Sequence, residues 1–577
     1  MNYYKRYIKP HLLYFILGPL GLIMEVAGDI MLPLLIADVI NKGAMTGDVA
    51  HIVKDLIIML AVILFGGVGG TLGSYWSSKA SMSAGSAIRK DLFVKIQSFS
   101  FTNIDEFSTG SLITRLTNDI TQIQNIIMMA LRLVLRSPIM LVAAVIISFS
   151  LNARLAVIIL LIIPILSTII VVILKISMPR FDTMQKKLDK LNSVIQEGLV
   201  NIRVIKSFVR DDYEKQKFNT SNNDLNKSTI FAMKINLMSQ PVMNLAMHLT
   251  TIAVIWFGGT MIMEGTMEVG DLTAFISYVS QIQMSLTMLS RVFLNGSRAV
   301  ASFKRIDEVL RCDVDLTDEN SRQLGKEVET GSVEFKNVSY KYYKKRKQWV
   351  LQDLNFKIEG GETVGIIGAT GAGKSTLVSL IPRLYDVDEG EILIDGVNVK
   401  DYSLFNLREG VGMVLQKNTL FSGSIMENMQ WGNPLAGDKE VYAVCEEAQA
   451  HKFVTQFPSG YDTMLGQGGV NISGGQKQRL CIARALLKTP KILILDDSTS
   501  AVDTATEARI RENFAITLKD ATKIIIAQRI SSVINADKII VIDEGRVVGN
   551  GKHEELLKTC PTYYDIYDSQ MSKEVHA

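Results

Sequence analysis

Long apolar segments fill the first half of this chain, and they constrain its fold more than any other feature of the sequence. A segment of about 20 apolar residues is long enough to cross a bilayer as a helix. Lipid offers no partner to backbone amides, so such a segment must satisfy its own hydrogen bonds. Buried core helices are the alternative, and the number of runs without charged faces disfavours it. We place six spans at residues 11–40, 52–76, 126–149, 155–176, 241–263 and 272–294.

The connections between these spans alternate in charge. The short connections, at residues 41–50, 150–154 and 264–271, carry few cations, whereas the two long connections are rich in Lys and Arg. Positive charge is enriched on the cytoplasmic side of a membrane. We therefore expect a multi-pass protein of the cell membrane, with both termini and the second half of the chain in the cytoplasm.

The two long connections keep helical spacing at residues 84–101 and 184–208. The spans are therefore expected to continue as long cytoplasmic extensions. The tips of these extensions, at residues 102–110 and 208–215, are short and amphipathic. Such tips suit docking on another domain, and a solvated charged face is the alternative.

Two acids, Glu25 and Asp29, lie one helical turn apart inside the first span. Acids at membrane depth usually face a cavity or pair with a cation. A site for a cationic substrate is one interpretation of this pair. The interpretation that we favour is that the acids lie in a wet interface or pair with an arginine, and the candidates are Arg132, Arg136, Arg291 and Arg298.

The second span contains glycines four residues apart, Gly66 with Gly70 and Gly69 with Gly73. This spacing places small residues on one face of a helix, where a second helix can approach closely. The pattern predicts tight packing of the second span against a neighbouring helix.

The character of the sequence changes near residue 311. Residues 312–331 are polar, and we interpret them as a linker between a membrane domain at residues 1–311 and a second domain at residues 332–577. From residue 332 onward apolar and polar residues alternate, which is typical of strands in an α/β domain. The chain has 61 Lys and Arg against 58 Asp and Glu, so its charge indicates no nucleic-acid partner.

The sequence Gly-Ala-Thr-Gly-Ala-Gly-Lys-Ser-Thr follows an apolar run typical of a buried strand and precedes a helical pattern. Strand, glycine loop and helix are the context that a phosphate-binding GxxxxGK(S/T) loop requires. Glycines let the backbone amides turn toward phosphates, Lys374 can reach the terminal phosphates, and the Ser375 hydroxyl can ligate Mg²⁺. We expect the phosphates of a nucleotide to contact Gly368, Ala369, Thr370, Gly371, Ala372, Gly373, Lys374, Ser375 and Thr376.

Two further patterns belong to the same chemistry. The apolar run at residues 492–495 reads as a buried strand that ends in Asp496 and Asp497, and an acid at such a strand tip can hold Mg²⁺ beside Ser375. Ile-Ser-Gly-Gly-Gln at residues 472–476 opens a helix and forms a second anion site. One nucleotide cannot easily occupy both sites within one chain, which indicates a site shared between two chains.

Taken in order, the motifs resemble those of an ATP-binding cassette (ABC) domain. They are the glycine loop at residues 368–376, Gln416, the signature at residues 472–476, Leu-Ile-Leu-Asp-Asp at residues 493–497 and Ser-Ala-Val-Asp at residues 500–503. With six spans before it, the whole chain resembles a half-transporter of the exporter type, similar to multidrug exporters. The resemblance implies an α-helical membrane domain, with six transmembrane helices and long cytoplasmic extensions, fused to an α/β P-loop cassette.

The resemblance also implies a role for each matched residue. Tyr342 would stack on the adenine of ATP, with Tyr340 as the alternative, and Asp503 would lie in the loop that crosses the dimer interface. The Mg²⁺ shell would comprise Ser375, Gln416 and Asp496. The signature would cap the γ-phosphate of ATP bound to the opposite subunit through Ser473, Gly474, Gly475 and Gln476.

Two residues depart from the family pattern. Asp497 stands where the family usually has a glutamate as general base, and Gln528 stands where it usually has a switch histidine. With Gln416 these residues are the catalytic candidates. Both departures weaken the site built on Lys374, whereas the signature is intact. We therefore expect a homologous half-transporter as partner, in a heterodimer rather than a homodimer.

The resemblance implies an ATP hydrolase that exports a small amphipathic or lipophilic molecule by alternating access. The departures at Asp497 and Gln528 keep open an ATP-gated channel, or a regulatory subunit that binds nucleotide without transport. An importer built like an exporter is a further alternative. A soluble ATPase merely anchored to the membrane is disfavoured by the six spans.

Overall fold

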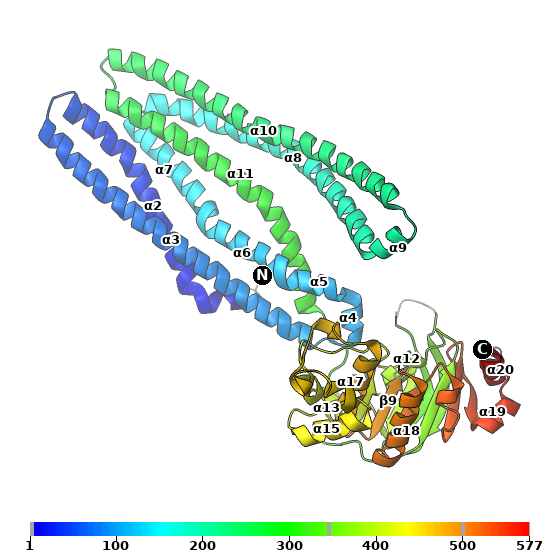
Figure 1. Cartoon of the computed structure of the whole chain (residues 1–577). Helices are drawn as coiled ribbons and strands as arrows, with labels where there is room; N and C mark the ends of the chain where they lie inside the picture. The colour runs from blue at the N-terminus through cyan, green and yellow to red at the C-terminus, as the bar shows by residue number, and fades with distance from the viewer. Residues whose placement is uncertain (1–4, 320, 343–347, 498–501, 576–577) are drawn as a thin grey trace. The chain divides into compact units, whose positions relative to one another are not determined.

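The computed structural model describes residues 5–319, 321–342, 348–497 and 502–575 (Figure 1). The chain forms two compact units. One comprises Met1–Gln97 and Thr109–Cys312, and the other comprises Ser98–Ser108 and Asp313–Ala577. We call them the membrane unit and the cassette unit.

Every element of the membrane unit that the structure describes is a helix, and short turns join these helices. Its elements are α1 (Lys5–Ile8), η1 (Lys9–His11), α2 (Leu12–Asp38), η2 (Val39–Ala44), α3 (Val49–Gln97), α5 (Thr109–Thr114), η3 (Arg115–Asp119), α6 (Ile120–Met129), η4 (Ala130–Val134), α7 (Leu135–Leu151), α8 (Ala153–Val200), α9 (Ile202–Ser207), α10 (Asp211–Met263) and α11 (Val269–Arg311).

The helices lie where the spans were predicted. Among the described residues, five helical stretches are long and apolar enough to cross a membrane, and they contain the first five predicted spans. The sixth, at residues 272–294, lies within α11, whose Phe275, Tyr278 and Ile282 are buried in the apolar core of the bundle. The predicted extensions are also helical, because α3 continues to Gln97 and α8 to Val200. In Figure 1, α8 and α10 run side by side and α9 joins them.

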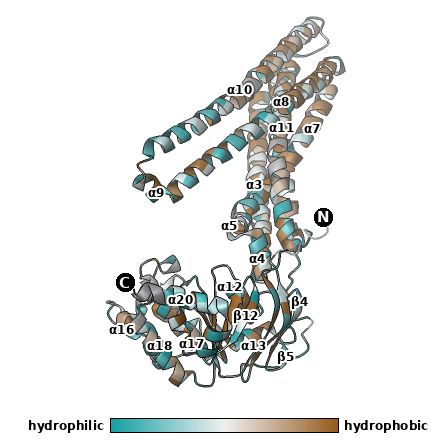
Figure 2. Ribbon diagram, turned by 90° about the vertical axis from the view of Figure 1, so that its right-hand side faces the viewer, coloured by the Kyte–Doolittle hydropathy of each residue, from teal (hydrophilic) through white to brown (hydrophobic). Residues whose placement is uncertain are grey.

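Apolar side chains cover the outside of the membrane unit. Leu56, Leu60 and Leu64, spaced one turn apart on α3, are 52%, 59% and 61% exposed. A soluble protein rarely exposes a continuous apolar surface of this kind. Lipid is its natural surrounding. Figure 2 shows hydrophilic residues gathering on α8 and α10 toward α9, as expected where a helix leaves the membrane.

Glycines bring α2 and α3 into close contact. A Cβ atom on Gly73 would lie 2.9 Å from the backbone nitrogen of Leu22 and 3.0 Å from the carbonyl oxygen of Gly18. On Gly69 it would lie 2.8 Å from the carbonyl oxygen of Gly21. The tight packing predicted from the glycine spacing is confirmed, and the neighbouring helix is α2.

The described residues of the cassette unit form three sheets and their covering helices. Its strands are β1 (Val333–Tyr340), β2 (Leu351–Ile358), β3 (Thr363–Gly368), β4 (Glu389–Ile394), β5 (Val397–Asn398), β6 (Val411–Val414), β7 (Gly423–Ser424), β8 (Met464–Leu465), β9 (Ile492–Asp496), β10 (Thr522–Ile526), β11 (Lys538–Asp543) and β12 (Arg546–Gly551). Its helices are α4 (Phe101–Phe107), α12 (Lys374–Leu380), α13 (Leu404–Glu409), α14 (Ile425–Gln430), α15 (Asp438–Glu447), α16 (His451–Val454), η5 (Gly460–Asp462), η6 (Gln467–Gly469), α17 (Gly474–Leu486), α18 (Thr504–Thr517), η7 (Ile530–Ser532), α19 (His553–Thr559) and α20 (Pro561–Val575).

The main sheet has the described strand order β12-β11-β3-β10-β9-β6 and is parallel except at β12. A second, antiparallel sheet has the order β2-β1-β4-β5, and β7 pairs with β8. Strand β9 is apolar on both faces because both are covered. Ile492 and Ile494 pack in the core shared with β1 and β2, and Leu493 and Leu495 pack in the core shared with α17.

The strand register sets the position of the nucleotide motifs. Ile526 of β10 pairs with Ile366 of β3 on one side and with Asp496 of β9 on the other. The carboxyl ends of β3 and β9 therefore lie at one edge of the sheet. In open parallel sheets this edge is where ligands bind.

The segment interpreted as a linker is part of the cassette unit from Asp313 onward. Leu316 and Val328 are buried, and Ser321 Oγ donates to the carbonyl oxygen of Tyr402 at 2.9 Å. Val328 belongs to the apolar core of the cassette unit, so this segment packs on that core.

Packing between α2 and α3 can be tested with alanine. We expect Gly73→Ala to destabilise the protein by about 1–3 kcal/mol, because the added methyl group forces the helices apart. Gly67 lies on the same helix, and a Cβ atom added there would have no neighbour within 4 Å. Gly67→Ala should therefore stabilise by up to about 1 kcal/mol through helix propensity. Thermal unfolding in detergent distinguishes the two variants, and equal midpoints would contradict the assigned contact.

Candidate nucleotide site and membrane cavity

The glycine loop connects the end of β3 to the start of α12. Gly371 and Gly373 have φ angles of 88° and 98°, a left-handed conformation that favours glycine. A Cβ atom on Gly373 would also lie 2.7 Å from Leu351 Cδ2. These two positions explain why the turn into α12 needs glycine.

The Lys374 ammonium lies over this loop. Its Nζ donates to the carbonyl oxygens of Gly368 and Ala369, both at 2.8 Å. Burial lowers the pKa of Lys374, and the nearby Asp496 and Asp497 act in the opposite direction. Neutral carbonyls are weaker acceptors for a cation than phosphate oxygens are. The loop therefore holds the Lys374 ammonium where it can bind a phosphate.

Asp496 and Ser375 meet beside the loop. Ser375 Oγ donates to Asp496 Oδ1 at 3.0 Å, and Asp496 is 4% exposed. Burial raises the pKa of Asp496, whereas the Ser375 hydrogen bond and Lys374 lower it. A hydroxyl and a carboxylate are oxygen ligands of the kind that Mg²⁺ prefers. The residues present thus fit the ion expected from the sequence.

The three catalytic candidates meet at one carboxylate. Gln528 Nε2 donates to Asp497 Oδ2 at 2.6 Å, and the Gln416 side chain is also hydrogen-bonded to Asp497. Burial raises the pKa of Asp497, and these two hydrogen bonds lower it. Gln416 was expected beside Mg²⁺. In this structure its described contact is with Asp497.

Two residues near Asp497 were missed by sequence reasoning. Gln478 of α17 is 1% exposed, and its Nε2 donates to the Asp497 carbonyl oxygen at 3.3 Å. Glu507 of α18 is buried, accepts from Ser532 Oγ at 3.0 Å and pairs with Arg511. For Gln478, the sequence signal was a polar glutamine among the apolar residues of α17, the helix that begins in the signature.

The signature lies at the N-terminus of α17. Ser473 Oγ accepts from the Gln476 backbone nitrogen at 3.2 Å, and Gln476 Oε1 accepts from the Ser473 backbone nitrogen at 2.9 Å. This capping box orders the helix start. Ser473 and Gly474 are exposed and Gly475 is half-buried, so the signature is at the surface of the cassette unit.

Asp503 caps the next helix, α18. Its Oδ1 accepts from the Thr506 backbone nitrogen at 2.9 Å, and this hydrogen bond lowers the pKa of Asp503. Ser500 and Ala501 of the same motif lie outside the described residues.

An aromatic cluster adjoins the glycine loop. The Tyr342 hydroxyl is 2.9 Å from Thr376 Oγ1, and the Tyr342 ring packs edge-on against Tyr340 and Tyr385. Tyr342 is 38% exposed and Tyr340 is 5% exposed. An adenine can reach only an accessible ring, so the geometry favours Tyr342 over Tyr340.

The first predicted tip contributes α4 to the cassette unit. The Tyr385 hydroxyl donates to Asp105 Oδ2 at 2.9 Å, and the ring centroids of Phe101 and Tyr385 are 5.9 Å apart. Since Tyr385 also contacts Tyr342, α4 connects to the aromatic cluster. The second tip belongs to the membrane unit, where Phe208 and Val209 are 74% and 82% exposed.

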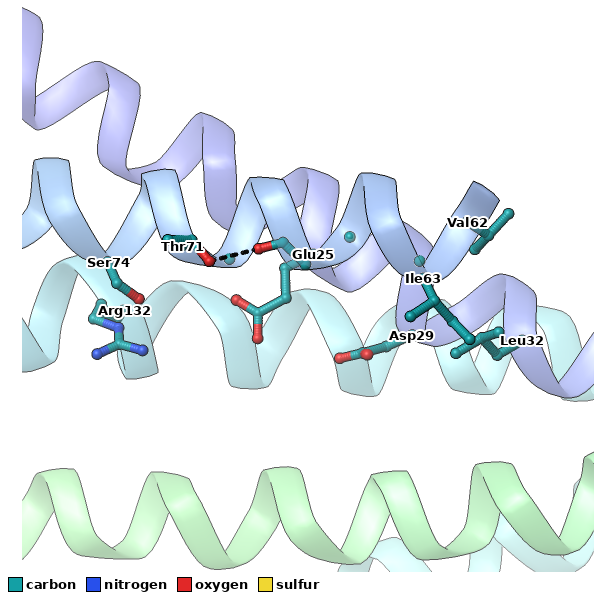
Figure 3. Close-up of a pocket in the computed structure, with 12 residues that line it drawn as sticks. Glu25, Asp29, Leu32, Val62, Ile63, Thr71, Ser74 and Arg132 are labelled. Carbon is teal, nitrogen blue, oxygen red and sulfur yellow. Dashed lines mark hydrogen bonds between the residues drawn. The ribbon is translucent and has the colours of Figure 1, made fainter. Parts of the chain in front are cut away.

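A cavity of about 440 Å³ lies in the membrane unit (Figure 3). Its polar lining includes Glu25, Asp29 and Arg132, and its apolar lining includes Leu32 and Ile63. Figure 3 shows the acids extending from α2 on the same side of the cavity.

Both acids pair with one arginine. Arg136 Nη1 is 3.1 Å from Glu25 Oε1, and Arg136 Nη2 is 2.7 Å from Asp29 Oδ2. Arginine pairing, one form of the favoured interpretation, is confirmed. The side chains of Arg291 and Arg298 lie outside the described set.

Comparisons with known proteins agree with this architecture. The family profile of the ABC transporter transmembrane region matches residues 15–286, and the ABC transporter profile matches residues 351–500. The uncharacterized ABC transporter ATP-binding protein YfiB of Bacillus subtilis is 39% identical over 570 residues, covering 98% of each chain. The chain belongs to the ABC transporter family.

Other relatives extend the ABC assignment over the full length. The uncharacterized ABC transporter ATP-binding protein YknU of Bacillus subtilis is 33% identical and covers 98% of this chain and 96% of its own. The structure of a bacterial Atm1-family ABC exporter with ATP bound matches with a TM-score of 0.81 and 25% identity, covering 98% of this chain and 99% of that one. The ABC chain thus has an exporter-type fold.

Nucleotide binding by this ABC transporter can be tested at Lys374. We expect Lys374→Ala to weaken ATP binding by about 10- to 100-fold, because hydrogen bonds to a charged group contribute about 1.5–3 kcal/mol each. A fluorescent ATP analogue titrated into the full-length protein measures the affinity. Lys439→Ala, at an exposed position on α15, should bind as the wild type does. Unchanged affinity in Lys374→Ala would refute the assignment.

Proposed function

We propose that this chain is one half of a dimeric ABC exporter that uses ATP to move a small amphipathic or lipophilic molecule out of the cell. The observation that carries the proposal is that the glycine loop and the signature lie at the starts of two different helices of one cassette. Lys374 lies over the glycine loop, and the exposed signature begins a different helix, α17. A second subunit can complete both sites.

Different residues of this chain have different roles at the two sites. The glycine loop and Lys374 hold the phosphates, and Tyr342 supports the adenine. Mg²⁺, when bound by Ser375 and Asp496, would neutralise charge that develops on the phosphates. The signature of the partner would cover the γ-phosphate and exclude bulk water. Ser473 and Gly475 here would do the same for the partner's site.

We propose that hydrolysis is impaired at the site built on Lys374. Asp497 is one methylene shorter than glutamate, and Gln416 and Gln528 hold its carboxylate. A general base must approach within about 2.6–3.2 Å of the proton that it takes. The raised pKa of Asp497 makes its carboxylate a stronger base. This does not compensate for the greater distance between the shorter side chain and the attacking water.

Gln528 limits the same step. Its amide donates a hydrogen bond to Asp497, but it cannot become a cation as histidine can. Two impaired sites would leave a homodimer with little turnover. A homologous partner with glutamate and histidine at the matching positions would restore one site, which supports the heterodimer.

The membrane cavity supports an amphipathic substrate. Leu32 and Ile63 offer apolar contact, and Glu25, Asp29 and Arg132 offer polar contact. Arg136 neutralises part of the acidic charge, so the cavity is not a simple cation trap. Apolar area and a few polar groups together are typical of small-molecule sites.

The orientation follows from the basic extensions of α3, α8 and α10. We place these extensions, both termini and the cassette in the cytoplasm, and the bundle in the cell membrane. The exposed Phe208 and Val209 suit docking on a cassette during transport.

The alternative functions are an importer and a nucleotide-gated subunit without transport, and Asp497 and Gln528 favour the second of these. ATP-dependent accumulation of substrate in inverted membrane vesicles supports export, and its absence with ATP binding intact favours the alternatives.

The two sites should respond differently to mutation in the assembled transporter. We expect Ser473→Arg to abolish ATP turnover, because it blocks the signature that completes the partner's site. Asp497→Asn should change turnover by less than about twofold, because this base contributes little. ATPase assays on the reconstituted complex measure both.

Ser424 begins α14 with the same capping box as Ser473 and provides a matched control. Ser424→Arg should retain ATP turnover. If only Ser473→Arg loses turnover, the loss cannot be attributed to a missing helix cap. Brisk hydrolysis by the purified chain alone, stopped by Asp497→Asn, would contradict the unequal pair.

A further inference from the structure

Three potential metal ligands converge where α2 meets α3. Asp38 is the last residue of α2, and His51 and Asp55 lie in the first two turns of α3. His51 Nε2 is 3.1 Å from Asp38 Oδ2 and 3.1 Å from Asp55 Oδ2. The three ligand atoms lie within 4.8 Å of one another.

One oxygen of this cluster has no donor. His51 Nε2 carries at most one hydrogen, and its hydrogen bond is with Asp38 Oδ2. Asp55 is 3% exposed, and its Oδ2 has no hydrogen-bond partner among the described residues. A buried carboxylate oxygen without a donor is costly. Asp55 Oδ2 and Asp38 Oδ2 both lie near His51 Nε2, so a cation among these three atoms would give each of them a partner.

The surrounding hairpin holds the ligands in place. Lys42 Nζ contacts Asp38 Oδ1 at 2.7 Å, which leaves Oδ2 directed toward His51. Asp48 Oδ1 accepts from the His51 backbone nitrogen at 3.1 Å and fixes the first turn of α3. Such outer contacts orient metal ligands.

We propose that Asp38, His51 and Asp55 bind one divalent transition-metal ion, with zinc as the best match. Imidazole nitrogen and carboxylate oxygen are zinc ligands with bonds of about 2.0–2.2 Å. Ligands of a tetrahedral ion with such bonds lie about 3.4 Å apart. The 3.1 Å contacts at His51 are close to this separation.

The donor set distinguishes between metals. Calcium takes six to eight oxygen ligands, and magnesium keeps several waters around a few carboxylates, so neither calls for a histidine. Three protein ligands leave a fourth position for water, as in open zinc sites. Borderline transition metals suit a mixture of imidazole and carboxylate.

The ion would fasten the end of α2 to the start of α3. The same connection also receives α11, because the Gly270 backbone nitrogen donates to Asn41 Oδ1 at 2.7 Å. A metal here would therefore stiffen the ends of three helices. With the proposed orientation this end faces the outside of the cell. The binding itself does not depend on that orientation or on transport.

Zinc binding to the full-length protein in lipid nanodiscs tests the proposal. The protein is stripped with a chelator and dialysed against Zn²⁺, and bound metal is counted by mass spectrometry. We expect the wild type to retain one more zinc ion per chain than His51→Asn or Asp55→Asn. Glu264→Gln removes an exposed acid at the end of α10, and His248→Asn removes an exposed histidine of α10, so both should bind as the wild type does.

Thermal unfolding gives an independent readout. Zinc should raise the unfolding midpoint of the wild type and of both control variants, but not that of His51→Asn. Without metal, Asp55→Asn should unfold at a higher temperature than the wild type, because it removes a buried charge that lacks a donor. Equal zinc content in the wild type and His51→Asn, with equal midpoints, would overturn the proposal.

Discussion

The arrangement of parallel strands in the cassette determines where its chemistry can occur. Strand β10 lies between β3 and β9, and its register brings the glycine loop and Asp496 to one edge. Lys374 then supplies positive charge, and Ser375 lies beside Asp496. The signature is fixed at the start of another helix, α17. The half-transporter fold implies dimerisation, and we propose that a second chain closes over a nucleotide on the loop.

The membrane unit depends on a different constraint, because the hydrophobic effect does not drive helices together within lipid. Small residues let backbones approach where lipid competes with every apolar side chain. Gly69 and Gly73 do this against α2. The same helix pair carries the acids that Arg136 neutralises, and its connection carries the proposed metal ligands. One helix hairpin therefore combines close packing, a cavity lining and a point of attachment near its end.

Periodicity and motif spacing predicted the helices, the α/β cassette and the glycine loop, because these depend on local sequence. Contacts between distant residues were harder to predict. Nothing local to Gln478 shows that it reaches the backbone of Asp497, and nothing local to residues 313–331 shows that Val328 enters the cassette core. The pairing of Glu25 and Asp29 was predicted in kind, but the choice of Arg136 among four arginines required the fold. The convergence of His51 with Asp38 arises from a turn between two helices.

We propose above all that this chain holds ATP while its partner hydrolyses it. Vanadate traps the product nucleotide only at a site that has turned over, and a photoreactive azido-ATP then labels the subunit that supplied the glycine loop. The experiment uses the complex purified from native membranes. We expect the trapped label on the partner subunit, with unhydrolysed ATP retained by this chain. Equal trapping on the Lys374 loop of this chain would contradict the account.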